Sequence, residues 1–367
     1  MPANRNSKVM WSFSKLTDLI HAWLYETFSP AWALALEMVM VGVAAIGLFA
    51  MLGLVLVIME RKVSAYMQIR LGPNRVGPKG MLQSLADTLK LLVKEGMTPN
   101  GVDRVLFNLA PLVAMIAAML LLAPIAFAKD FQIWDLNIGV LYITAISSLN
   151  VIAILMAGWS SNNKYSLLGA MRSGAQIVSY ELSAGLSILT IVVLSGSLQI
   201  SDIVTSQSNG WWIFKGHIPA IIAFVIFLIA ATAETNRAPF DMAEAESELT
   251  GGFHTEYSGM KFALFFLAEY INVFVVCAVG ATLFLGGWMP LHIGSLDWFN
   301  HAMDYIPSSI WFFGKTFFLI FVMMWFRWTF PRLRIDQLLT LEWKYLLPIG
   351  MVNILLVTVI AILKWHF

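Results

Sequence analysis

Residues 38–59 read MVMVGVAAIGLFAMLGLVLVIM, a run of 22 residues without a charged side chain. About 20 consecutive apolar residues are needed for a helix to cross the hydrocarbon core of a bilayer. The chain as a whole is 59% hydrophobic and only 12% charged, against about 25% charged in a typical soluble domain. A soluble fold of this length could not bury so much apolar surface, so the sequence predicts an all-α integral membrane protein.

Seven further apolar stretches follow this one, so about eight transmembrane helices are expected. Glu181, Glu269 and Lys315 fall inside three of them. Pro111 and Pro124 fall inside the second stretch, where neighbouring helices can satisfy the backbone groups that proline frees. The expected spans are residues 38–59, 105–128, 141–159, 175–194, 217–233, 262–285, 306–326 and 345–363.

Lys and Arg are divided unequally between the two sides of these spans. Sixteen of the 23 fall in the loops that follow odd-numbered spans, and the other seven fall on the opposite side. Cytoplasmic loops carry the excess of basic residues, so the odd-numbered loops are expected in the cytoplasm and both termini outside. Lys315 and Lys364 lie near the outer ends of their spans, from which long side chains can reach the headgroup region.

No internal repeat, linker or low-complexity tract interrupts the chain, so residues 35–367 are expected to form a single polytopic membrane domain. Residues 1–34 are an N-terminal extension, in which apolar side chains recur at near-helical spacing between residues 7 and 30. An interfacial helix on the outer surface is expected there. Cys277 is the single cysteine, which excludes an internal disulfide and a Cys-clustered zinc or iron–sulfur site.

The first cytoplasmic loop is basic and turned. It opens with Glu60-Arg61-Lys62 and contains Gly-Pro steps at residues 72–73 and 77–78, which favour a non-helical backbone. The basic side chains, Arg70 included, fit either a topogenic patch that touches lipid headgroups or a group that faces a cavity or a partner protein. Residues 81–95 then show an amphipathic pattern too short and too polar to span, which predicts an interfacial helix.

The third cytoplasmic loop is acidic, against the trend of the other cytoplasmic loops. Like charges four residues apart on a helix, as at Glu244 and Glu248, repel each other, and such crowding should raise some carboxyl pKa values toward neutrality. A solvated face that binds a basic partner and a series of proton-binding sites are both open. No metal site is expected, because no His or Cys joins the cluster at ligand spacing. The acids are Glu234, Asp241, Glu244, Glu246, Glu248 and Glu256, opposed by Arg237 and Lys261.

Two more acids lie within expected spans. Glu181 and Glu269 are each about two turns from the cytoplasmic end, where a charge in contact with lipid is costly. They should therefore face the bundle interior or water, and both could hold protons at neutral pH. Pairing with Arg172 or Arg237 is the structural alternative, and it does not exclude proton transfer.

These segments together resemble one membrane component of NADH:quinone oxidoreductase, which is called the H subunit in bacteria and subunit 1 in mitochondria. The first signature is Glu60-Arg61-Lys62 with residues 70–78, and the second is residues 233–241 with the acids that follow. Residues 179–182 and 268–270 also fit. The resemblance covers about residues 35–365, all but the N-terminal extension.

The resemblance implies a subunit of proton-translocating respiratory complex I that has no complete active site of its own. It would form much of the tunnel for the substrate quinone and bind no cofactor, since FMN and iron–sulfur clusters are expected on partner subunits. The expected partners are peripheral-arm subunits, antiporter-like and small membrane subunits and the lipid bilayer, with no nucleic acid. The bacterial cytoplasmic (inner) membrane is favoured over the mitochondrial inner membrane.

By the same resemblance, two groups of residues carry the function. The tunnel residues are Arg61, Lys62, Arg70, Arg237, Phe265 and Phe266. The proton-path residues are Glu181, Glu234, Asp241, Glu244, Glu246, Glu248, Glu269 and Asp87.

Two other functions compete with this one. An autonomous ion or solute transporter would also bury carboxylates, but usually with internal repeats or broken helices. The membrane anchor of a related hydrogenase or ferredoxin-linked complex is the other, and the full-length match to the quinone-type loop motifs argues against the hydrogenase version.

Overall fold

The computed structural model describes residues 13–129, 131–208, 210–243, 246–292 and 297–363. Among these, seven helices are long and apolar enough to cross a membrane, which confirms a multi-pass, all-helical membrane fold. They are α2 (Pro30–Met67), α5 (Gly139–Ser160), α6 (Lys164–Ser195), α9 (His217–Glu234), α11 (Gly259–Phe284), α13 (Ser308–Thr329), and the continuous run of α14 (Ile335–Leu341), a π-helical turn (Glu342–Leu346) and α15 (Leu347–Ile362).

The second expected span, residues 105–128, is shorter than predicted. Helix α4 (Arg104–Leu120) is 17 residues long, or about 25 Å at 1.5 Å per residue. Pro111 lies inside it, but Pro124 lies beyond its end, because the residue before a proline is pushed out of the helical region. The chain instead turns into an antiparallel pair of short strands, β1 (Ala126–Ala128) and β2 (Phe131–Gln132), with Ala126 opposite Gln132.

The chain divides into two compact units, residues 1–52 and 53–367, and the division falls within α2. In the first unit, α1 (Phe13–Thr27) forms where an interfacial helix was expected, and Pro30 begins α2. The imidazole Nδ1 of His21 on α1 lies 3.1 Å from Glu37 Oε1 on α2. This pair connects the two helices of that unit.

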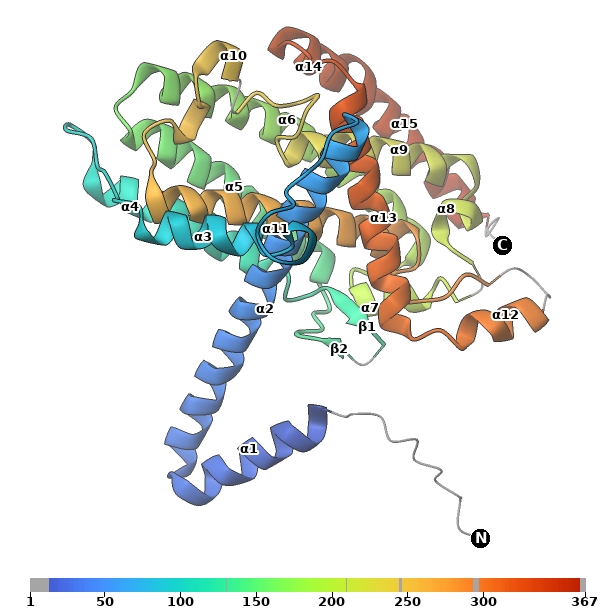
Figure 1. The fold of residues 1–367 in the computed structure, drawn as a ribbon. Helices are drawn as coiled ribbons and strands as arrows, with labels where there is room; N and C mark the ends of the chain where they lie inside the picture. Colours follow the sequence, from blue (N-terminus) through green and yellow to red (C-terminus); the bar gives the residue numbers. More distant parts are fainter. Residues whose placement is uncertain (1–12, 130, 209, 244–245, 293–296, 364–367) are drawn as a thin grey trace. The chain divides into compact units, whose positions relative to one another are not determined.

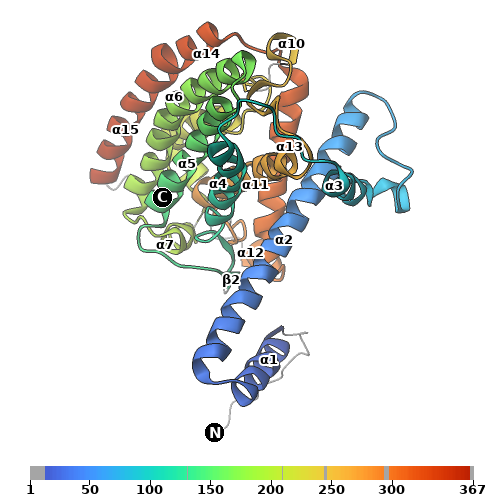
Figure 2. The same cartoon turned by 90° about the vertical axis from the view of Figure 1, so that its left-hand side faces the viewer.

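The second unit is built around α6 and α11 (Figures 1 and 2). Helix α6 packs against α5, α9 and α15, whereas α11 packs against α4 and α13. Asn163 caps the start of α6, accepting from the Tyr165 amide at 2.9 Å, and Gly196 ends it in the left-handed conformation. Close contact of α6 with α5 depends on Gly158, where a Cβ would lie 2.2 Å from Ala170 Cβ.

Short elements join the long helices of this unit. The first loop turns through Pro78–Gly80 into α3 (Gln83–Val93), which confirms the expected amphipathic helix and lies beside α11. The remaining short elements are α7 (Ile200–Thr205), α8 (Trp212–Lys215), α10 (Glu246–Leu249), a 3₁₀ turn (Gly252–His254) and α12 (Asp297–Asp304).

One expectation about a charged residue is wrong. Lys315 on α13 does not extend toward a headgroup region but is buried, at 7% exposure. Its Nζ donates to the carbonyl oxygens of Leu285, Gly287 and Met289 at 2.6, 2.9 and 2.6 Å. These carbonyls follow the end of α11, where no helical amide is left to donate to them. Lys364 lies outside the described residues.

Substitution of Gly158 by Ala should destabilise the α5–α6 contact. Alanine normally stabilises a helix by about 0.8–1.0 kcal/mol relative to glycine. The new methyl group would, however, overlap Ala170 and the Ser166 carbonyl, and such overpacking typically costs about 1–3 kcal/mol. Thermal unfolding of the purified complex should show a lower transition for Gly158→Ala. Gly314→Ala on α13, where nothing lies within 4 Å of the added Cβ, should show no decrease; equal behaviour of the two variants would contradict the packing argument.

Candidate functional site

A buried carboxylate holds two arginines together where α2, α13 and the loop after α9 meet. Glu60 is 5% exposed and Arg237 is 8% exposed. Arg237 Nη1 donates to Glu60 Oε2, and Arg327 Nη1 donates to Glu60 Oε1. Each carboxylate oxygen of Glu60 therefore accepts from a different guanidinium group.

Arg237 also reaches a second carboxylate. Its Nε lies 2.9 Å from Glu269 Oε1, and its guanidinium carbon lies 4.5 Å from the centre of the Tyr270 ring. Burial by itself lowers the pKa of Arg237, but the carboxylates of Glu269 and Glu60 outweigh it and hold that pKa well above its ordinary value. Arg237 therefore stays charged and links Glu60 to Glu269.

This network forms part of the wall of a cavity of about 430 Å³. Arg61, which also forms an ion pair with Asp87 on α3, and Arg70, whose Nε donates to Gln68 Oε1 at 2.6 Å, contribute two further cations. The cavity is lined by Glu60, Arg61, Ser64, Arg70, Pro73, Arg237, Phe266, Glu269, Tyr270, Arg327 and Trp328. We call it the arginine cavity. Lys62 is not among its lining residues, because its Nζ donates to the Lys79 carbonyl instead.

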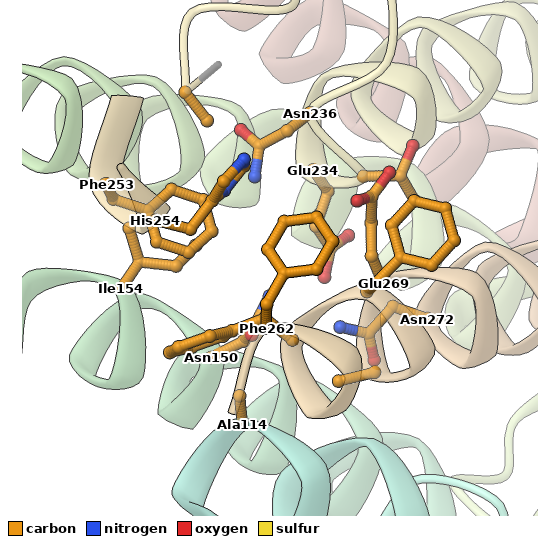
Figure 3. A pocket seen from close by; sticks show the side chains of 15 residues that line it. Ala114, Asn150, Ile154, Glu234, Asn236, Phe253, His254, Phe262, Glu269 and Asn272 are labelled. Atoms are coloured by element: carbon orange, nitrogen blue, oxygen red, sulfur yellow. The ribbon is translucent and has the colours of Figure 1, made fainter. Parts of the chain in front are cut away.

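A second, smaller cavity of about 40 Å³ shares Phe266 and Glu269 with the first. Phe253 and His254 lie on one side of it, and Glu269 and Asn272 lie on the other (Figure 3). Its lining also includes Asn150, Glu234, Asn236, Phe262 and Phe265. We call it the middle cavity, since it carries a carboxyl group from α9 as well as one from α11.

A third cavity, of about 540 Å³, lies between α5, α6, α9 and α11 and shares Glu234 with the middle cavity. Its walls are mainly Leu, Val and Ile, with Thr144, Ser147, Glu181 and Glu234 as the polar residues. Glu181 accepts a hydrogen bond from Ser148 Oγ on α5. We call it the apolar cavity. The three cavities are therefore adjacent, and Glu269 and Glu234 are the carboxyl groups at their shared walls.

The structure separates the remaining predicted acids from these cavities. Glu248 is exposed and accepts from Arg172 Nη1 at 2.6 Å, and this hydrogen bond lowers the pKa of its carboxyl group. Asp241 is half-buried and lines none of the three cavities. Glu246 begins α10, and Glu244 lies outside the described residues.

The alternative that Glu181 and Glu269 pair with Arg172 or Arg237 holds for Glu269 but not for Glu181. Arg237 pairs with Glu269, whereas Arg172 pairs with Glu248 and leaves Glu181 bonded to Ser148. Helix α6 begins at Lys164, so Glu181 lies 17 residues from its start, deeper in the helix than the expected span implied. Phe265 is buried, with its ring 5.0 Å from that of Tyr257, and it lines the middle cavity but not the arginine cavity.

Sequence reasoning did not select three of the residues that organise this site. Glu60 stood in the first signature without a role, and neither Arg327 nor Tyr270 was chosen. Glu60 lies 177 residues from Arg237 and 267 from Arg327 in the chain, so local pattern could not pair them. Glu60 and Arg327 are charged residues at the ends of long apolar runs, and that signal could have marked them. Among the described residues, no group of three His, Cys, Asp or Glu side chains is placed to hold a metal ion.

The fold and site together define a multi-pass membrane protein with a buried ion network leading into a line of cavities. The NADH dehydrogenase family model matches residues 38–358. The chain is 58% identical to the NADH-quinone oxidoreductase H subunit of Bacteroides thetaiotaomicron, over 98% of this chain and the whole of that protein. It is 54% identical to the H subunit of Phocaeicola vulgatus over the same shares. The H subunit of Brevibacillus brevis is 46% identical over 91% of this chain and 96% of its own. The chain belongs to the family of NADH-quinone oxidoreductase H subunits, and it is a component of that complex.

Removal of the Glu60 charge should destabilise the protein more than loss of an exposed ion pair. Breaking a buried pair by neutralising one partner typically costs about 3–5 kcal/mol, because the remaining charge is left uncompensated. Thermal unfolding of the complex should show a clearly lower transition for Glu60→Gln. Glu60→Gln combined with Arg327→Gln should be less destabilised than the sum of the single variants, with a coupling energy of about 0.5–3 kcal/mol.

The Arg172–Glu248 pair is the matched control for that cycle. It is largely solvent-exposed, with side-chain exposures of 31% and 53%, so its coupling energy should be about 0.2–1 kcal/mol. Additive effects in the Glu60–Arg327 cycle would contradict the assignment of Glu60 as the centre of the network.

His254 should make stability depend on pH on the acid side of neutrality. Burial lowers the pKa of His254 to about 4, whereas the unfolded value is about 6.5. The unfolded chain therefore binds the proton more readily, so stability falls as the pH decreases from about 6.5 to about 4. Replacing His254 with Gln should reduce the loss of thermal stability between about pH 7.5 and about pH 5; an unchanged pH dependence would contradict the burial argument.

Proposed function

We propose that this chain forms much of the wall of the quinone-binding tunnel of NADH-quinone oxidoreductase, and that its buried carboxyl groups couple quinone reduction to proton pumping. One observation carries the proposal. The arginine cavity, the middle cavity and the apolar cavity adjoin one another, and a carboxyl group lies at each shared wall. A path from the arginine cavity into the helix bundle would therefore pass Glu269 first, then Glu234 and then Glu181.

The arginine cavity suits a quinone as it is reduced. A neutral quinone ring and its tail can pack against apolar and aromatic walls, which Phe266 and Tyr270 supply here. Negative charge that develops on the quinone oxygens is stabilised by nearby fixed cations, and more strongly in a partly dry cavity than in water. Arg61, Arg70 and Arg237 are the cations proposed for this role, and Phe265 contributes apolar wall to the adjoining middle cavity.

The electrons must come from other subunits of the complex. FMN and iron–sulfur clusters belong on those partners in this proposal, and the chain supplies no redox centre of its own. What it contributes is a set of cations and carboxyl groups around the substrate. Peripheral-arm subunits would complete the tunnel, and antiporter-like and small membrane subunits would receive the effect of the coupling.

Arg237 is the proposed link between the quinone and the carboxyl groups. It interacts with both Glu60 and Glu269, so charge appearing on a nearby quinone competes with these carboxylates for one guanidinium group. A carboxylate that loses part of its counter-charge binds a proton more readily. Closely spaced acids titrate as a set, and proton uptake at Glu269 would therefore change the proton affinity of Glu234 and then of Glu181.

Orientation and assembly complete the proposal. The excess of Lys and Arg on one side favours an orientation with the arginine cavity at the cytoplasmic end and both termini outside. Isolation of the complex through a tag on this chain tests the assembly, because quinone-site and antiporter-like subunits should be recovered with it and the preparation should reduce quinone. Recovery of this chain alone, moving ions in liposomes, would favour an autonomous transporter.

Neutralisation of Glu269, Glu234 or Glu181 should uncouple or slow the complex. Losing a proton-transfer group commonly lowers a rate by on the order of 10²–10⁴, so Glu269→Gln and Glu234→Gln should each lower proton pumping by about tenfold or more. Quinone reductase activity and pumping are measured together in inverted membrane vesicles. Glu181→Gln belongs to the same set, and wild-type values of both quantities would remove Glu181 from the path. Glu95→Gln, at an exposed acid after α3, is the control and should retain both activities.

A further inference from the structure

A second line of buried polar side chains runs along α6, and the three cavities do not account for it. Ser173, Gln176, Tyr180, Ser183 and Ser187 recur every three or four residues, so they share one face of the helix, and all are buried. Glu181 lies two residues from Ser183, on a different face. The polar line meets the part of the chain formed by α14, the π-helical turn and α15, and also the loop after α9.

A carboxyl group from another helix lies against this line. Glu342 is 0% exposed. Ser183 Oγ donates a hydrogen bond to its Oε1, while its Oε2 is buried without a hydrogen-bond partner. No ion pair to Glu342 occurs in the described part of the chain. Tyr180, one turn before Ser183, donates to the Leu338 carbonyl at 3.1 Å, four residues before Glu342.

Such a group is costly to bury and has no structural partner that repays the cost. An ionised carboxylate without a counter-charge is far more expensive to bury than the neutral acid, and even the neutral acid leaves one oxygen unbonded. Glu342 also opens the π-helical turn Glu342–Leu346 within the α14–α15 run. Turns of this type are rare, and they occur frequently at functional sites.

The loop that follows α9 packs in the core that flanks this carboxyl group. Leu338 and Leu346, four residues to either side of Glu342 and on the same helix face, pack in one core with Phe240 and Met242 of the loop. Gln176 Nε2 fixes the loop to α6, donating to the Phe240 and Ala233 carbonyls at 2.7 Å each. A shift of the loop would therefore disturb the packing of Leu338 and Leu346, on either side of Glu342.

We propose that Glu342 is a further proton-binding residue of the coupling apparatus, separate from Glu269, Glu234 and Glu181 and controlled by the loop that shares a core with Leu338 and Leu346. It binds one proton from water and returns that proton to water when movement of the loop changes its access. The groups that face it from α6 are Tyr180 and Ser183, and those packed beside them from α9 and the loop are the uncharged Ala233, Phe240 and Met242. The inference rests on the proposed coupling function, because it uses the same loop.

The test uses the assembled complex carrying Glu342→Gln, which keeps the size of the side chain and can still accept from Ser183. Infrared difference spectra between the oxidised and quinone-reduced complex should lose a carbonyl-stretching band of a protonated carboxyl group. The ratio of protons pumped to quinone reduced should fall, while uncoupled quinone reductase activity is retained. Asp336→Asn, at an exposed acid on α14, is the matched control and should change neither quantity.

Wild-type difference spectra and a wild-type pumping ratio in Glu342→Gln would overturn the proposal. Glu234→Gln in the same experiments reports separately on the proposed path through Glu269, Glu234 and Glu181. If only Glu234→Gln lowers the pumping ratio, Glu342 is not part of the coupling apparatus, but the path through Glu269, Glu234 and Glu181 stands. If only Glu342→Gln lowers the ratio, the role of Glu342 is supported and that path is contradicted.

A second variant keeps the test decisive if Glu342→Gln does not assemble. Ser183→Ala leaves the carboxyl group in place but removes the hydrogen bond that Ser183 Oγ donates to it. One carbonyl-stretching band of a protonated carboxyl group in the difference spectrum should then shift in frequency without disappearing. If no such band shifts in Ser183→Ala, the carboxyl group next to Ser183 does not change its protonation with quinone reduction, and the proposal is overturned.

Discussion

The carboxylate of Glu60 holds together three segments that are far apart in the chain. Its two oxygens accept from Arg237 and Arg327, so the end of α2, the end of α13 and the loop after α9 are fixed at one point. Neither guanidinium group could be buried there without a counter-charge, because the cost of removing an unpaired ion from water exceeds what packing returns. The position of Arg237 beside Glu269 and Tyr270 follows from this arrangement, and so does the wall of the arginine cavity.

Arg237 makes this network suitable for coupling as well as for structure. It is shared by two carboxylates and lines a cavity of about 430 Å³, so its interactions can respond to charge in that cavity. A pair closed within a core could not respond in this way. The proposed order of Glu269, Glu234 and Glu181 extends the response into a cavity whose walls are otherwise almost wholly apolar. Interactions between charges in such surroundings are less screened than in water.

Burial of charge also distinguishes structural groups from proposed functional ones in this protein. Lys315 is buried, but its hydrogen-bonding capacity is satisfied, since Nζ donates to three backbone carbonyls. Glu342 is buried, and its hydrogen-bonding capacity is only partly satisfied: Oε1 accepts from Ser183, whereas Oε2 has no hydrogen-bond partner. A fully satisfied charge is explained by the helix end that it stabilises. The unbonded oxygen of Glu342 is free to take up a proton, and for this reason we propose a proton-binding role for Glu342.

The sequence by itself determined the membrane class and the approximate places of the helices, because apolar length is a local property. It also determined that α3 lies outside the set of spans, and it marked Arg61, Arg70, Arg237, Glu234 and Glu269, which charge and spacing made conspicuous. It placed the end of the second span too late, since Pro124 was compatible with either a kinked helix or a turn until the strands that follow it were seen.

Only the tertiary structure decided which charges meet. Glu60 and Arg327 are separated by 267 residues, and Glu342 meets Ser183 across 159 residues, so no periodicity connects either pair. The inward position of Lys315 likewise depended on carbonyls from another helix. Local patterns report whether a residue suits lipid or water, whereas the partner of a buried charge is set by the packing of distant segments.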